Sequence, residues 1–172
     1  DLKGKKDLLK YSDDLFEIVN SEYSSLYAFS QLSKRQIEQL KKQFISILRL
    51  DFVSIVLDSS DKVVGFGITL PSIAKAKQKN KGKLFPFGFL RIMHALKKND
   101  TVDTLLIAIR KEYQNKGING LIFHDIMSAF IKNGVTNLES TRELEDNNKV
   151  NNLWNKFEYR QHKRVRCYIK TL

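Results

Sequence analysis

The chain has 172 residues, of which 42% are hydrophobic and 28% are charged, and its formal net charge is +11. This length allows one sizeable core and is short for two, and the apolar content excludes an intrinsically disordered chain. Because no run of about 18 consecutive apolar residues occurs, no membrane-spanning helix is expected, and we predict a single soluble domain over residues 1–172.

The first seventy residues predict two helices followed by a β-hairpin. Apolar residues recur at near-helical spacing over positions 8–19 and 37–48, and Ser33 is a suitable N-cap for the second helix. Residues 51–57 and 62–70 are β-branched, apolar runs joined by DSSD, which is typical of an antiparallel hairpin.

A lysine-rich loop is expected after Pro71, which interrupts a strand. Its lysines stand at alternating positions: Lys75, Lys77, Lys79, Lys81 and Lys83. The apolar run LFPFGFL comes next, and a short helix is expected after Gly88. From Lys75 to Phe89 this pattern fits contact with an anionic membrane, where lysines meet the headgroups and phenylalanines enter the interface. The alternative is that the phenylalanines pack in the core and the lysines are simply solvated.

The second half of the chain predicts a buried strand followed by mixed elements. Residues 101–110 form a nearly continuous apolar run, as expected for a strand covered on both faces. Helical spacing over residues 118–133 predicts the next helix. A short strand over 137–141 and a helix over 150–157 follow, and alternation over 164–169 predicts a final strand.

The positive charge is concentrated in two segments, residues 71–98 and 160–170, which contain no acidic residue. They hold 13 of the 30 lysines and arginines, so the rest of the chain, with 17 against 19 acidic residues, is nearly neutral. Local positive charge indicates an anionic partner, which can be a phosphorylated cofactor, nucleic acid or an anionic membrane. The aromatic residues directly after the lysines favour the membrane over nucleic acid.

The expected location is the cytoplasm, with peripheral contact at the inner membrane as a further expectation. Cys167 is the only cysteine and cannot form an internal disulfide, which indicates a reducing compartment. The opening segment DLKGKKDLLK is too charged for a signal peptide. Because the sequence opens on Asp1 rather than methionine, we expect it to be part of a longer protein.

The stretch EYQNKGING links the strand that ends at Arg110 to the helix that begins near Ile118. A turn of this kind presents unpaired backbone N–H groups and the positive end of the helix dipole, which together bind phosphate. Gly117 lets the backbone approach an anion closely, while Gln114 and Lys116 can add side-chain donors. The stretch matches neither the dinucleotide fingerprint GxGxxG nor the Walker loop, and an ordinary strand-to-helix turn is the alternative.

The run IAIRKEYQNKGING resembles the acetyl-coenzyme A pyrophosphate loop of the GNAT N-acyltransferase superfamily, whose pattern is R/Q-x-x-G-x-G/A. Gln114 and Gly117 match it, and Asn119 stands where a small residue is expected. The run NNKVNNLWNKFEY resembles the NxxAxxLYxKxGF segment of the same superfamily. The resemblance implies an α/β (α+β) fold with a mixed, mainly antiparallel central sheet flanked by helices, and acetyl-CoA or acyl-CoA as acyl donor. The cofactor-binding residues that it implies are Ile107, Ile109, Gln114, Asn115, Lys116, Gly117, Ile118, Asn119, Gly120 and Asn147.

Residues 65–98 and the run HKRVRCYIK are similar to the C-terminal part of long bacterial GNAT-like proteins, some of which are bacterial ceramide synthases. This resemblance implies an acyl-CoA-dependent N-acyltransferase that transfers an acetyl or longer acyl group to an amine, with a sphingoid amine as one candidate acceptor. The stretch STRELEDN departs from the subgroup pattern. The alternative function is a noncatalytic module of the same fold that binds anionic lipid or nucleic acid through its basic surface.

Amine attack on a thioester requires one group that takes up the proton and others that stabilise the oxyanion. By the resemblance, backbone groups of Ile107 and Ile109 would pair with the pantetheine arm and polarise the carbonyl. Glu139, on the strand expected beside residues 101–110, is the first candidate base, with Glu145 behind it. Asp103 is a second acid-base candidate, and a solvated strand residue is the alternative interpretation for these acids.

The remaining candidates are interpreted as structural. Trp154 replaces a tyrosine that is frequent in GNAT enzymes, and we expect it to pack in the core. The three histidines lack metal-ligand spacing, so no metal site is predicted. Cys167 lies in a predicted strand, where a nucleophilic role is not expected.

Overall fold

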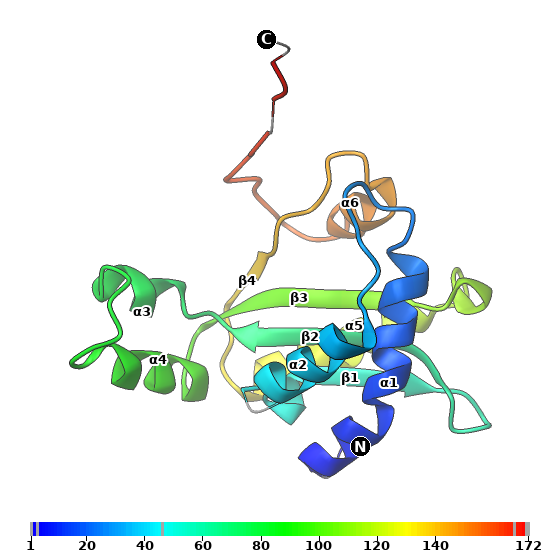
Figure 1. Ribbon diagram of the computed structural model, residues 1–172, viewed down its shortest axis with the longest axis horizontal. Helices are drawn as coiled ribbons and strands as arrows, with labels where there is room; N and C mark the ends of the chain where they lie inside the picture. The colour runs from blue at the N-terminus through cyan, green and yellow to red at the C-terminus, as the bar shows by residue number, and fades with distance from the viewer. Residues whose placement is uncertain (1, 3, 46, 167, 171–172) are drawn as a thin grey trace. The chain divides into compact units, whose positions relative to one another are not determined.

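The computed structural model of the protein describes residues 2, 4–45, 47–166 and 168–170, with the side chain of residue 149 excepted (Figure 1). Residues 1–141 and 142–172 form two units, and each is described by itself. The expectation of one domain over residues 1–172 therefore stays a prediction. Of the helices in the described residues, none is both long and apolar enough to cross a membrane.

The first unit is built on a sheet of four strands in the order β1-β2-β3-β4. The strands are β1 (Val53–Leu57), β2 (Val63–Pro71), β3 (Thr101–Ile109) and β4 (Asn137–Ser140). The first two pairings are antiparallel and the last is parallel. This arrangement confirms the predicted mixed, mainly antiparallel sheet.

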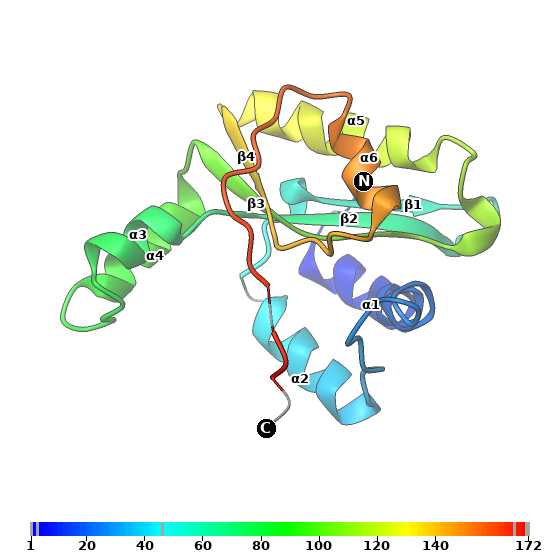
Figure 2. The same ribbon diagram turned by 90° about the horizontal axis from the view of Figure 1, so that it is seen from above.

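Helices cover both faces of this sheet (Figure 2). On one face lie α1 (Lys5–Glu22) and α2 (Lys34–Phe44), and α5 (Ile118–Lys132) lies on the other. The second helix begins as predicted, because Ser33 caps it and exchanges hydrogen bonds with Gln36. A 3₁₀ turn (Leu50–Phe52) leads into β1 where the sequence predicted the start of the strand.

Each face of the sheet has its own apolar cluster. Toward α1 the cluster contains Ile18 and Phe66, both fully buried, and toward α5 it contains Ile122 and Ile126. A Cβ atom at Gly67 would lie 2.6 Å from Ile122 Cγ2 and 2.8 Å from Ile126 Cδ1. The missing side chain at this glycine therefore allows α5 to pack directly against β2.

A bulge divides β3 into two parts. The register with β2 shifts between Ile68 and Thr69, which pair with Leu106 and Thr104, so Leu105 is the extra residue. The parallel pairing with β4 covers only the first part and ends at Thr104. Beyond the bulge, no other described strand pairs with the outer edge of β3. The sheet therefore opens on this side from Leu105 to Ile109.

Residues 72–98 form an arm that projects beyond the sheet (Figures 1 and 2). It contains α3 (Ala74–Lys79) and α4 (Gly88–Lys97), which contact one another. The prediction of a short helix after Gly88 is confirmed. The prediction of a plain loop over the lysines is partly wrong, because residues 74–79 form a helical turn in which alanine, lysine and glutamine all favour helix.

The second unit contains α6 (Asn148–Trp154), close to the helix predicted over residues 150–157. The predicted strand over 164–169 is wrong for the residues described there, which form no strand, and Cys167 lies outside the described residues. Alternation makes a strand only where a neighbouring strand and a packed face complete it. Here the alternating side chains are exposed, with Val165 at 69% and Ile169 at 96%.

Candidate functional site

A turn of unusual backbone conformation connects β3 to α5. It contains a 3₁₀ turn (Lys111–Tyr113), then Asn115 at φ +61° and Gly117 at φ +82°, the latter as N-cap of α5. The left-handed conformation at this cap favours glycine. A Cβ atom at Gly117 or at Gly120 would have no atom within 4 Å, so the space in front of this helix end is open within the described chain.

The open helix end suits an anion. The first turn of α5 contains no acidic residue, and the backbone N–H groups of Gly120 and Leu121 point back to the Gly117 carbonyl. No acceptor in the described part of the chain takes the N–H groups of Ile118 and Asn119. Together with the helix dipole, these donors make a site for phosphate.

A buried arginine fixes the base of this turn. The guanidinium group of Arg110 donates to both carboxylate oxygens of Glu17 at 3.0 and 3.2 Å and to the Val63 carbonyl at 2.7 Å. Arg110 is only 7% exposed. Its hydrogen bonds lower the pKa of the Glu17 carboxyl below its ordinary value. The turn is thereby attached to α1 and to β2 at its first residue.

Glu22 at the end of α1 holds the next part of the turn. Its carboxylate accepts the Lys111 N–H at 3.1 Å and the side-chain amide of Gln114 at 2.9 Å. The same amide donates to the Ile109 carbonyl at 3.0 Å. Gln114, predicted as a side-chain donor to the anion, thus uses this nitrogen within the protein. Lys116 is exposed, and its Nζ lies 5.3 Å from the centre of the Tyr113 ring.

The open edge of β3 presents backbone groups on the way to this turn. Residues of an antiparallel strand point their backbone groups to alternate sides, and Arg110 N–H donates to Val64 O in β2. The alternation directs Ala108 toward β2 as well, and it directs Ile107 and Ile109 toward the open edge. The Ile109 carbonyl accepts the Gln114 amide there, and the Ile107 carbonyl accepts a hydrogen bond from Tyr23, 2.9 Å away.

Tyr23 is a site residue that the sequence did not reveal. It follows the last residue of α1 and is 84 residues from Ile107 in the chain. Burial raises the pKa of its hydroxyl, which therefore stays protonated and acts as a donor. Only its place at the end of an amphipathic helix could have suggested it, and such a position does not identify a partner.

Two predicted acids meet on the first half of β3. Asp103 and Glu139 are direct partners in the parallel pairing of β3 with β4, and they share the sheet face that α1 covers. Burial raises the pKa of the Asp103 carboxyl, the hydroxyl of Ser72 lowers it, and the charge of Glu139 raises it further. The structure therefore brings the first candidate base and the second acid-base candidate together.

The other predicted residues belong to the second unit. Glu145 is exposed, and Arg166 donates to both of its carboxylate oxygens at 3.0 Å, which lowers its pKa. Asn147 caps α6 and accepts the Val150 N–H at 3.5 Å. Trp154 is half-buried, and its indole N–H donates to Glu143 at 2.9 Å. Paired in this way, Glu145 is a weaker candidate base than Glu139.

The chain has the fold of solved GNAT acetyltransferases, as predicted. No known protein-family model matches the chain. Among solved structures, the chain is similar to aminoglycoside acetyltransferase meta-AAC0020 from an uncultured soil metagenomic sample, with TM-score 0.59, 14% identity, and 98% of this chain and 92% of that chain covered. A ribosomal-protein-alanine N-acetyltransferase from Brucella melitensis biovar Abortus 2308 gives TM-score 0.55 and 11% identity over 95% and 94% of the two chains.

Two curated relatives are longer than this chain. It is 27% identical over 165 residues to Protein YghO of Escherichia coli (strain K12), covering 92% of this chain and 42% of that protein. It is 25% identical over 177 residues to the bacterial ceramide synthase of Caulobacter vibrioides (strain NA1000 / CB15N), covering 96% and 45%. The chain thus spans less than half the length of these relatives.

Proposed function

We propose that the chain is an acyl-CoA-dependent N-acyltransferase that transfers an acyl group from a coenzyme A thioester to an amine. One observation carries the proposal: the open edge of β3 leads directly into an open helix N-terminus with phosphate-binding character. The solved acetyltransferases of the same fold include enzymes in complex with coenzyme A or a coenzyme A conjugate, which supports the proposed donor.

The residues fit a coenzyme A thioester in two places. The backbone N–H groups of Ile118 and Asn119, with Lys116 beside them, suit the negative charge of a pyrophosphate. The N–H groups of Ile107 and Ile109 face the open edge and can donate to the amides of an extended arm, as one strand does to another. When bound, the donor supplies an activated acyl carbonyl with a good leaving group.

Asp103 and Glu139, here called the acid pair, can take up the proton that an amine must lose. Most amines are protonated near neutral pH and must lose a proton before they attack a carbonyl. Two adjacent carboxyl groups, Asp103 and Glu139, attract a cationic amine and can accept this proton. The pair lies two residues before the bulge, about 7 Å along the strand. We assign the role of base to Glu139, acting directly or through one water.

The acceptor that we favour is a lipid amine. The support is the similarity to a protein named bacterial ceramide synthase, together with the surface of the α3–α4 arm. The phenylalanines of this arm do not pack in the core, so that part of the alternative interpretation is wrong. Phe85 is 79% exposed, Phe87 65% and Leu90 53%.

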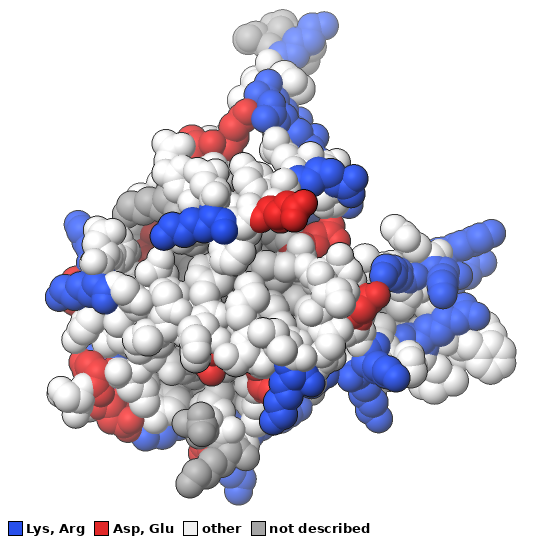
Figure 3. Space-filling model, turned by 180° about the vertical axis from the view of Figure 1, so that it is seen from behind, with Lys and Arg blue, Asp and Glu red and all other residues white. Residues whose placement is uncertain are grey.

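The arm also collects positive charge, and Figure 3 shows lysine and arginine side chains gathered on it. Residues 71–98 contain eight basic residues and no acidic residue. Cationic and aromatic side chains exposed together suit the interface of an anionic bilayer. We propose that the arm contacts such a membrane peripherally and that a noncatalytic lipid-binding module is the second candidate function.

Release of free thiol from an acyl-CoA tests the proposed function, with and without a panel of amines. The account predicts release that depends on an amine, and Glu139→Gln should lower the rate roughly 100-fold while CoA affinity is kept. Glu158→Gln, an exposed glutamate in the second unit, is the matched control and should leave the rate unchanged. Amine-independent release would indicate hydrolysis of the thioester in place of transfer and would contradict the proposal. No release from a protein that binds CoA would favour the noncatalytic module.

A further inference from the structure

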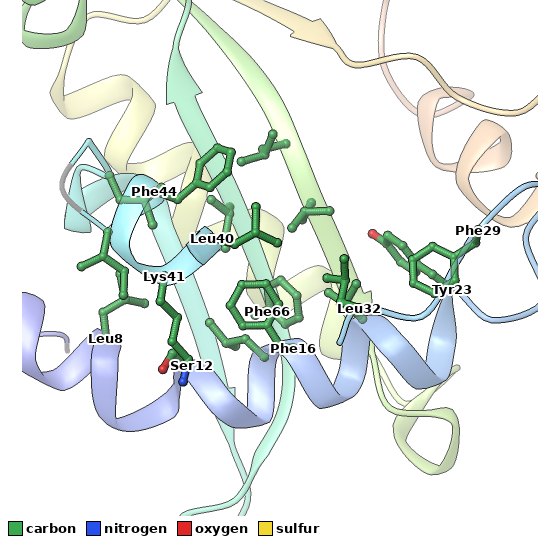
Figure 4. A pocket seen from close by; sticks show the side chains of 17 residues that line it. Leu8, Ser12, Phe16, Tyr23, Phe29, Leu32, Leu40, Lys41, Phe44 and Phe66 are labelled. Carbon is green, nitrogen blue, oxygen red and sulfur yellow. The ribbon is translucent and has the colours of Figure 1, made fainter. Parts of the chain in front are cut away.

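A cavity of about 320 Å³ lies between α1, α2 and the sheet (Figure 4). Ligand pockets in proteins typically hold about 300–1,000 Å³. The cavity is partly open to solvent, so a ligand can enter it. The cavity lining includes Leu8 and Val19 of α1, Leu40 and Phe44 of α2, and Phe66 and Leu106 of the sheet. A space of this size inside the first unit therefore calls for an occupant.

The lining is suited to hydrocarbon. Three of the described lining residues carry polar side-chain groups, and each group already has a partner in the protein. Ser12 Oγ donates to Leu9 O at 2.7 Å, and Tyr23 donates to Ile107 O. Lys41 turns its Nζ to Asp13 and Glu38, at 2.6 and 2.8 Å, and lines the cavity with its stem. A pocket with such a lining favours apolar ligands.

Helix α2 covers the cavity without filling it. None of its residues is buried, although Ile37, Leu40 and Phe44 form an apolar stripe at helical spacing. In Figure 4, Leu40 and Phe44 point toward α1 and the sheet. The apolar face of α2 thus remains only partly packed, as expected for a helix that covers a ligand.

The cavity is elongated along α1. Its lining extends along α1 from Leu8 to Tyr23, and fifteen residues of helix measure about 22 Å. At the Tyr23 end, the tyrosine hydroxyl contacts Ile107 at the open edge of β3. The bulge turns both Leu105 and Leu106 to this side of the sheet, where they line the same space. One end of the cavity therefore adjoins the place proposed for the thioester.

We infer that this cavity binds the hydrocarbon chain of a long acyl-CoA donor, with the tail toward Leu8 and Phe44. The inference rests on the proposed function, because the donor's position at Ile107 comes from it. A chain attached there enters beside Leu105 and Leu106. The acid pair lies two residues before the bulge on the same sheet face, so the tail of a lipid amine is the competing occupant, and a long-chain amine is therefore included in the experiment.

The experiment compares the affinities of acetyl-, octanoyl- and palmitoyl-CoA by calorimetry, with palmitate displacing a fluorescent fatty acid as a second arm. Each buried methylene should tighten acyl-CoA binding roughly three- to fourfold until the cavity is full. Leu40→Trp, which narrows the cavity from the adaptable α2 side, should weaken palmitoyl-CoA at least 10-fold and leave acetyl-CoA unchanged. Gln39→Trp, on the exposed side of the same helix, is the matched control.

Equal affinity for all three acyl-CoAs, or equal effects of the two tryptophan variants, would overturn the inference. If no CoA thioester binds, the proposed function fails. The palmitate arm then tests separately whether the cavity binds a hydrocarbon chain. Displacement that Leu40→Trp abolishes and Gln39→Trp preserves then supports a chain-binding cavity. Absence of displacement overturns it. A long-chain amine is tested as a second competitor in the displacement arm, and displacement by the amine as strong as that by palmitate would contradict the assignment to the donor.

Discussion

Asp103 is a carboxyl group that folding places in an unfavourable setting for its charge. Burial, and then the neighbouring charge of Glu139, raises its pKa above the ordinary aspartate value. An acid whose pKa rises on folding binds its proton more tightly in the folded state. Its ionisation therefore destabilises the protein as the pH rises from the ordinary value of about 3.9 through the folded pKa.

Asp103→Asn should accordingly raise Tm at neutral pH, because the amide carries no charge and its oxygen can still accept a hydrogen bond. The gain should shrink as the pH falls toward about 3, where the wild-type carboxyl is protonated in both states. Thermal unfolding of both proteins across this pH range measures the difference. A lower Tm for the variant at neutral pH would show that the charge stabilises the fold.

The pKa of Glu17 shifts in the opposite direction to that of Asp103. Glu17 joins α1 to the turn before α5 through Arg110. Its pKa is lowered by the hydrogen bonds from Arg110, so its contribution to stability is present above the unfolded pKa of about 4.3 and is lost as the pH falls through the folded pKa. Arg110 is buried, whereas the Glu17 side chain is 63% exposed, so solvent weakens the pair.

Glu17→Gln should therefore cost about 1 kcal/mol at neutral pH, because it leaves the buried guanidinium with a weaker partner. Urea unfolding of the variant at neutral and at acidic pH measures this cost, which should vanish in acid. Glu158→Gln serves as the control for the loss of one exposed carboxylate. An equal loss in both variants would mean that the ion pair does not hold the turn.

The α3–α4 arm gives a second prediction at this scale. Phe87→Ser with Phe89→Ser should reduce sedimentation with anionic liposomes, and binding should fall with salt, because the lysines act through surface potential. Ile131→Ser, which removes an 81% exposed apolar side chain from α5, should leave liposome binding unchanged. Binding to DNA or RNA at physiological salt without liposome binding would favour the nucleic-acid alternative.

Local pattern was sufficient to predict most elements of the first unit. Ser33 caps α2 and Gly88 begins α4, because both signals depend on residues near in sequence. The continuous apolar run predicted β3 because a strand covered on both faces has no polar side. The strand predicted over 164–169 failed since a strand needs a partner that alternation cannot supply. The bulge at Leu105 was also not predictable, because it depends on register against β2.

Local pattern predicted which elements carry the candidate residues, and it did not predict the long-range hydrogen bonds that hold them. Gly117, expected only to let an anion approach closely, takes a left-handed conformation, and Asp103 and Glu139 lie on neighbouring strands as expected. Tyr23 and Glu22 contact residues more than eighty positions away, and no local signal predicts such contacts. Gln114 stays a predicted donor to the anion, and in the structure its amide donates to Glu22 and to the Ile109 carbonyl.

Across the whole first unit, β3 organises every part of the proposed site. The acid pair lies on its first half, the bulge and the cavity lie at its middle, and the anion-binding turn follows its end. Asp103 and Ile109 are six residues apart, which is about 20 Å along a strand. A donor bound along this edge would therefore meet the cavity and then the acid pair in order.

Binding of coenzyme A is the claim on which the transferase account and the placing of the acyl chain both depend. Calorimetric titration of CoA into the protein and into Gly117→Asp tests it most directly. Gly134→Asp is the matched control, because Gly134 has φ +68°, no atom within 4 Å of an added Cβ, and lies at the other end of α5.

The account predicts that the wild-type protein and Gly134→Asp bind CoA and that Gly117→Asp does not, because its carboxylate would occupy the anion site. At a hundredfold excess over Kd, binding should stabilise the fold by about 2.7 kcal/mol, which raises Tm by roughly 5–10 °C. No heat of binding in the wild-type protein, or binding in Gly117→Asp equal to that in Gly134→Asp, would contradict the account.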